Sequence, residues 1–82
     1  MTIKLLFFSL LRDLTGIEEV DFPLPAESLS VYDLLELLFA SYPKLKDWDE
    51  NLLIAVNCEY ANREDLVKAG DEVAVMPPVQ GG

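Results

Sequence analysis

Eighty-two residues supply material for one small domain, because chains usually reach roughly 100 to 150 residues before a second hydrophobic core is favoured. Fifteen acidic residues against six basic ones give a formal net charge of -9, which argues against nucleic acid as a partner and favours basic protein surfaces. The chain has no histidine and one cysteine, Cys58, which excludes an internal disulfide and any ordinary zinc, iron-sulfur or histidine-based catalytic site. We therefore assign Cys58 no function and expect no bound metal or cofactor.

The apolar run at residues 5–11 is similar in composition to the core of a short signal peptide. It leads directly into Arg12 and Asp13 without a small-residue cleavage site, and it is far shorter than the roughly 20 residues that a membrane span needs. We therefore expect a cytoplasmic protein that is not bound to a membrane.

Two strands are predicted in the first part of the chain. Residues 2–8 alternate between two faces that both carry apolar side chains, and residues 17–22 form a second apolar segment. Between them, leucines at one-turn helical spacing followed by Gly16 predict a short helical bend. The segment 23–25, which has two prolines, should end the second strand because proline cannot donate to a ladder.

A helix is the clearest predicted element. Ser30 can cap its first turn, with Asp33 three residues later in a weak form of the capping box, and the helix should end near Pro43. Apolar residues follow the stripe of a face that packs on a sheet. The stripe consists of Val31, Leu34, Leu35, Leu38 and Tyr42.

The segment 44–51 is predicted to be a solvated connection. Its acids Asp47, Asp49 and Glu50 do not have the spacing of a calcium loop, because such a loop needs alternating oxygen ligands and a central glycine, and Trp48 stands between them. We therefore expect no calcium site.

The rest of the chain predicts three further strands. Residues 52–57 form one strand, residues 58–62 make a tight hairpin into a short return segment that carries Tyr60, and residues 72–76 form the last strand after a turn at 68–71. The resulting order is typical of the α+β arrangement called the β-grasp or ubiquitin-like fold, a mixed sheet packed on one main helix. We expect this domain to cover residues 1–76.

Residues 77–82 are predicted to be an extended tail. Pro77 and Pro78 favour a polyproline conformation, and six residues of this kind reach roughly 20 Å. Gly81 and Gly82 carry no side chains, so the terminal carboxylate is sterically open and can enter a narrow cleft. The combination with a β-grasp domain favours a functional terminus over a frayed end.

Four segments resemble the small subunit of molybdopterin synthase, the MoaD family, and the resemblance spans the chain. They are residues 6–8 (LFF), 11–16 (LRDLTG), 70–74 (GDEVA) and 77–82 (PPVQGG). This resemblance implies that a MoeB-type activating enzyme uses ATP to adenylate the carboxylate of Gly82, which is then converted to a thiocarboxylate.

The resemblance also implies the partner and the pathway. The tail would enter the active site of the large subunit, MoaE, and give its sulfur to cyclic pyranopterin monophosphate during molybdenum cofactor biosynthesis. Two small subunits would flank a dimer of large subunits. The chain would then be a subunit of a sulfurtransferase that is not catalytic by itself.

A partner-binding surface is predicted beside the tail. Phe8 and Met76 fall on the outward sides of neighbouring strands, and Tyr60 belongs near them, although scattered exposed apolar residues are common. The MoaD family commonly has an aromatic residue where this chain has Met76. The full set predicted to contact a partner is Phe8, Tyr60, Met76, Pro77, Pro78, Val79 and Gln80.

Three other functions are compatible with the same features. A sulfur carrier of thiamine synthesis, of the ThiS type, has the same fold and diglycine end, although the proline pair and the length favour the molybdopterin pathway. A ubiquitin-like modifier would join its terminus to lysines. A plain β-grasp interaction module would have an inert tail.

Overall fold

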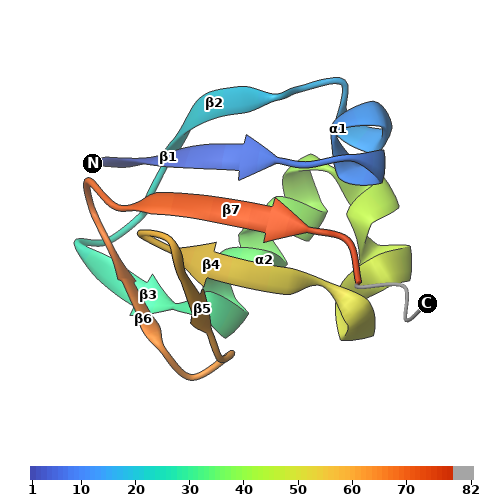
Figure 1. Cartoon of the computed structure of the whole chain (residues 1–82). Helices are drawn as coiled ribbons and strands as arrows, with labels where there is room; N and C mark the ends of the chain where they lie inside the picture. Colours follow the sequence, from blue (N-terminus) through green and yellow to red (C-terminus); the bar gives the residue numbers. More distant parts are fainter. Residues whose placement is uncertain (79–82) are drawn as a thin grey trace.

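The computed structural model describes residues 1–78 and shows a five-stranded sheet with a helix packed across one face (Figure 1). The strand order is β2-β1-β7-β4-β5, and the central pair β1 and β7 is parallel whereas the other neighbours are antiparallel. The strands are β1 (Thr2–Phe7), β2 (Glu19–Pro23), β4 (Leu53–Val56), β5 (Glu59–Ala61) and β7 (Glu72–Met76). This mixed sheet with one main helix is the predicted α+β architecture.

The helix α2 (Val31–Ser41) begins where the capping pattern predicts. The backbone N–H of Asp33 donates to Ser30 Oγ at 3.1 Å, which satisfies one of the free donors in the first turn. The members of the predicted stripe within the helix are buried, with Phe39 added to them, whereas Tyr42 is half-buried and follows the last turn. Tyr42 meets the ring of Phe7 edge-on at a centroid distance of 5.3 Å, which joins the helix end to β1.

The first strand separates core from surface by simple alternation. Ile3, Leu5 and Phe7 are at most 1% exposed and face the helix, as their shared parity predicts. After Phe7 the chain turns into the short helix α1 (Leu10–Thr15). Gly16 ends this helix with a φ of 75°, a left-handed conformation that glycine adopts without a Cβ penalty.

The second strand differs from its predicted limits. It begins at Glu19 rather than residue 17, and it includes Pro23, which pairs with Thr2. Pro23 is tolerated because β2 is an edge strand, where a missing N–H donor costs no ladder bond to an outer neighbour.

A second, two-stranded sheet was not predicted. It consists of β3 (Ser28–Ser30) and β6 (Leu66–Lys68), which pair antiparallel. The carbonyls of Arg63 and Asp65, just before β6, accept hydrogen bonds at 2.9 and 2.8 Å from the first N–H groups of α2. The small sheet therefore anchors the start of the main helix.

The prediction of a solvated connection at residues 44–51 agrees with the exposure of most of its side chains, but it missed a helix and a buried leucine. The segment forms the 3₁₀ helix η1 (Pro43–Asn51), in which Leu45 is fully buried and Trp48 is half-buried. Lys46 Nζ lies 5.0 Å from the centre of the Phe39 ring, a cation-π contact that holds η1 against α2. Leu45 is therefore the one residue of this charged segment that is buried in the core.

The hairpin between β4 and β5 is a two-residue turn made by Asn57 and Cys58. Both residues have positive φ, 52° and 71°, as a type I′ hairpin turn requires. Asn57 also ties the hairpin to β7, because its side chain accepts from Glu72 N at 3.0 Å and donates to Asp71 Oδ1 at 3.1 Å. The turn is thus fixed to the start of the last strand.

The last strand ends at Met76, and the half-buried Pro77 and Pro78 follow it outside any strand. Within residues 1–78, no helix has both the length and the apolar character that a membrane crossing requires. The same residues contain no group of three or more histidine, cysteine or acidic side chains placed to hold a metal ion.

Candidate functional site

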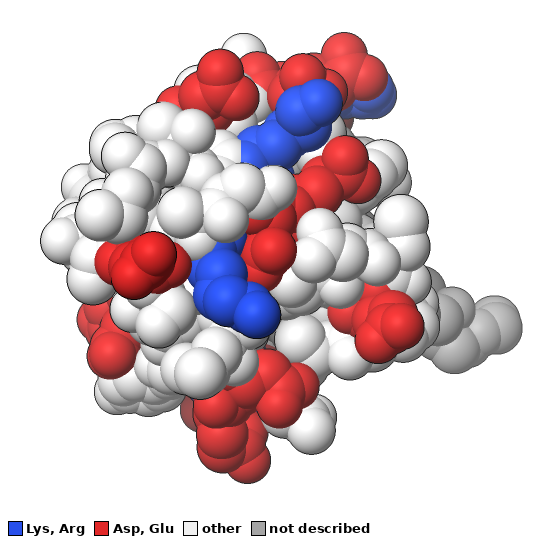
Figure 2. Space-filling view, turned by 90° about the vertical axis from the view of Figure 1, so that its left-hand side faces the viewer, with Lys and Arg blue, Asp and Glu red and all other residues white. Residues whose placement is uncertain are grey.

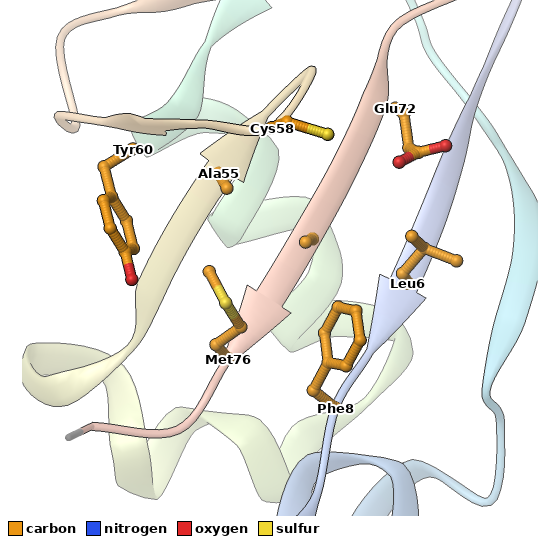
Figure 3. A pocket seen from close by; sticks show the side chains of 8 residues that line it. Leu6, Phe8, Ala55, Cys58, Tyr60, Glu72 and Met76 are labelled. Atoms are coloured by element: carbon orange, nitrogen blue, oxygen red, sulfur yellow. The ribbon is translucent and has the colours of Figure 1, made fainter.

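The face of the main sheet opposite α2, which we call the outer face, carries a row of apolar side chains across four strands. The strand registers pair Leu6 with Ala74, Ala74 with Ala55, and Ala55 with Tyr60. Because the two central members are alanines, the larger side chains around them enclose a hollow of about 300 Å³ (Figure 3). This outer-face hollow is a direct consequence of small residues at the centre of a sheet.

Phe8, Met76 and Tyr60 border this hollow at the end where β7 leaves the sheet (Figure 3). The N–H of Phe8 donates to the carbonyl of Val75 at 3.2 Å, which sets Phe8 beside Met76. Phe8 is 46% exposed and Tyr60 is 75% exposed, so both rings offer apolar area to a partner. The tail begins directly after Met76, and this apolar surface therefore lies at its base.

Cys58 and Glu72 lie at the opposite end of the outer-face hollow (Figure 3). Among the lining residues that the structure describes, only Glu72 carries a formal charge. Two ion pairs lie on the β1 and β2 side of the sheet, with Arg12 at 3.8 Å from Glu18 and Lys4 at 4.0 Å from Glu19. Charged side chains therefore lie near the apolar surface on this side of the sheet.

Negative charge also prevails elsewhere on the molecule. Figure 2 shows acidic side chains in several separate groups on the face at the left of Figure 1, with fewer basic ones between them. This distribution agrees with the net charge of -9 and favours association with basic surfaces.

The structure brings the predicted residues Phe8, Tyr60 and Met76 to one surface, with Pro77 and Pro78 next to it in the chain. The predicted site residues Val79, Gln80, Gly81 and Gly82 lie outside the described residues.

Sequence reasoning assigned no part in the site to Leu6, Ala55, Cys58, Glu72 or Ala74, which also line the hollow. The alternation that directs Phe8 and Met76 outward also directs Leu6 and Ala74 outward, so this signal was present in the sequence. The described residues form an apolar hollow, and the reactive group of the predicted chemistry is the terminal carboxylate, which lies outside them.

Comparison with known proteins gives full-length relatives. A molybdopterin synthase sulfur carrier subunit of Chlamydomonas reinhardtii is 37% identical over 84 residues and covers 100% of both chains. The protein of the same name from Dictyostelium discoideum is 33% identical over 81 residues and covers 96% of this chain and 94% of its own.

Solved structures share the fold closely. A putative molybdopterin converting factor, subunit 1, from Pyrococcus furiosus matches with a TM-score of 0.83 and 33% identity, covering 96% of this chain and 99% of its own. The protein SAMP1 from Haloferax volcanii matches with a TM-score of 0.83 and 27% identity over 100% of both chains.

A third solved structure is a complex of subunits 1 and 2 of the molybdopterin-converting factor from Helicobacter pylori. The matching chain has a TM-score of 0.65 and 26% identity over 100% of both chains. The model of the ThiS family matches residues 5–82, which includes both terminal glycines. With that match over nearly the whole length and relatives above 30% identity, this chain belongs to the ThiS family.

Proposed function

We propose that this chain is the sulfur carrier subunit of molybdopterin synthase and that it acts in the cytoplasm. The observation that carries the proposal is its full-length similarity to sulfur carrier subunits of that enzyme, which extends to the diglycine end. The apolar outer face at the base of the tail supports the proposal, because a carrier needs a surface that docks where its terminus is delivered.

The chemistry takes place at the carboxylate of Gly82. A carboxylate oxygen attacks the α-phosphorus of ATP on a MoeB-like activating enzyme, which forms an acyl adenylate and releases pyrophosphate. Hydrosulfide then attacks the carbonyl carbon, the bond to AMP breaks, and a thiocarboxylate and a proton are formed. ATP is a substrate of the activating enzyme, and the chain itself is the group that is modified.

The partner that receives the sulfur is a MoaE-like large subunit. The tail 77–82 enters its active site, and the thiocarboxylate gives sulfur to cyclic pyranopterin monophosphate. Phe8, Tyr60 and Met76 contact the large subunit beside the tail, and the assembly contains two small and two large subunits. The large subunit supplies the catalytic groups, so the carrier alone has no activity.

A reconstituted reaction tests this function. The thiocarboxylated chain is mixed with the large subunit and cyclic pyranopterin monophosphate, and molybdopterin is measured. We expect product with the thiocarboxylate and none with the free carboxylate. No product here, together with thiazole formation in a thiamine-pathway reconstitution, would contradict the proposal and favour the thiamine carrier.

A protein modifier is the second candidate, and the similarity to the small archaeal modifier protein SAMP1 favours it. In that function the activated carboxyl of Gly82 forms an isopeptide bond with a lysine amine. The discriminating measurement is immunoblotting of cells that produce the chain with an N-terminal tag. Conjugates of high mass that disappear when Gly82 is deleted would support the modifier.

A further inference from the structure

Tyr60 separates the outer-face hollow from a second hollow at the edge of the sheet. This edge groove has a volume of about 370 Å³ and lies by β5 and the start of β6. Val56 and Leu66 supply apolar lining, and Glu59 and Asp65 line the groove as well. Because Tyr60 lines both hollows, the two form one continuous surface around the edge strand.

The two carboxylates of the edge groove come from different segments of the chain. Glu59 pairs with Val56, and neighbouring residues on a strand point to opposite faces, so Glu59 points away from the face that carries Tyr60. Asp65 is fixed in its turn, since its Oδ2 accepts from the N–H of Asn62 at 2.8 Å. Leu66 is 62% exposed, which leaves an apolar area beside these acids.

The negative charge of the edge groove comes from Glu59 and Asp65. Within residues 1–78, the ion pairs do not include Glu59 or Asp65. Arg63 is close in sequence, but its guanidinium is engaged by Asp49 at 2.8 Å. An incoming cation therefore meets carboxylates that are not already neutralised.

We propose that the edge groove receives an arginine side chain of the protein that docks on the outer face. The aliphatic stem of arginine fits against Leu66 and Val56, while its planar guanidinium can pair with a carboxylate of the groove. The inference rests on the proposed function, because it takes the large subunit of molybdopterin synthase as that protein. The proposal adds one basic contact, in the edge groove, to an interface that is otherwise apolar.

The test compares two double variants that remove the same charge. Glu59→Gln with Asp65→Asn alters the groove, and the asparagine can still accept from Asn62. Glu27→Gln with Glu36→Gln alters exposed acids before β3 and on α2, away from the outer face. Binding to the large subunit is measured by titration calorimetry at low and high salt, after circular dichroism has confirmed that each variant is folded.

We expect the groove variant to bind about tenfold more weakly at low salt and the control variant to change less than about twofold. The difference should shrink at about 1 M salt, where screening extends over only a few ångströms. Equal losses of affinity in both variants would show that only net charge matters. That result would overturn the proposal that the groove binds an arginine and would leave the proposed function intact. Failure of the unaltered chain to bind the large subunit would overturn both.

Discussion

At the scale of single residues, the Arg63 side chain joins two segments that are distant in sequence. Its guanidinium donates to Asp49 Oδ1 at 2.8 Å and to the carbonyl of Asp49, which links the loop before β6 to η1. The hydrogen bond from Arg63, aided by the charges of Arg63 and Lys46, holds the pKa of Asp49 below its ordinary value of 3.8. A lowered pKa in the folded state means that this contact stabilises the fold above that value and is lost as the pH falls through the folded pKa.

We predict that Arg63→Ala lowers the free energy of unfolding at pH 7 by about 0.5 to 1 kcal/mol, a small value because both side chains are about one third exposed and water screens them. Urea unfolding at pH 7 and again well below 3.8 measures the effect. The difference from the unaltered chain should shrink at the lower pH, where Asp49 becomes protonated and the hydrogen bond to its carbonyl remains.

Arg12→Ala is the control, since Arg12 and Glu18 are 3.8 Å apart and both are more than half exposed. This variant should show no measurable change at either pH. An Arg63 effect that is the same at both pH values would mean that the packing of the side chain or its hydrogen bond to the Asp49 carbonyl, rather than the ion pair, is responsible.

At the scale of elements, the sequence predicted the parts whose signal is local and periodic. Ser30, Asp33 and the leucine stripe specify α2 because capping and a period of 3.6 residues are both visible in the chain. The strands β3 and β6 have three residues each, too few for alternation to be distinguished from chance. Their pairing depends on contacts between residues about 40 positions apart, which no local pattern encodes.

For the helix η1, the composition of the segment gave a wrong indication of burial at one position. Its many charged residues indicate solvent, yet Leu45 is fully buried in the main core. We predict that Leu45→Ala lowers the free energy of unfolding by about 2 to 5 kcal/mol, because the substitution leaves a cavity. Thermal and urea unfolding, followed by circular dichroism, measure the loss.

Leu66→Ala serves as the matched control, because it removes the same atoms from a side chain that is 62% exposed. Its effect on unfolding should stay within about 0.5 kcal/mol. Similar small losses in both variants would show that η1 is not part of the core.

At the scale of the whole molecule, the outer face is the part of the fold on which the proposed partner binding depends. Alternation along β1 and β7 predicted that Phe8 and Met76 share a face, and the parallel pairing of these strands sets them side by side. The shape of the hollow could not be predicted, because it depends on Ala55 and Ala74 meeting across strands that are distant in sequence. A role for this face in binding stays a prediction.

We predict that Phe8→Asp weakens binding to the large subunit by more than about 1 kcal/mol, because an aromatic anchor is lost and a charge must be desolvated. Tyr32→Asp is the control, since Tyr32 is a 56% exposed aromatic residue on α2. Calorimetric titration of both variants gives the comparison. Equal affinity of the Phe8 variant and the unaltered chain would remove Phe8 from the interface.

The central claim is that the terminal carboxylate of Gly82 carries sulfur. The most direct test is the intact mass of the chain after incubation with ATP, a MoeB-like activating enzyme and a sulfide source. The proposal predicts a gain equal to the replacement of one oxygen by one sulfur, located in the C-terminal peptide and absent when Gly82 is deleted. An unchanged mass, with an activating enzyme shown to be active on its own carrier, would contradict it.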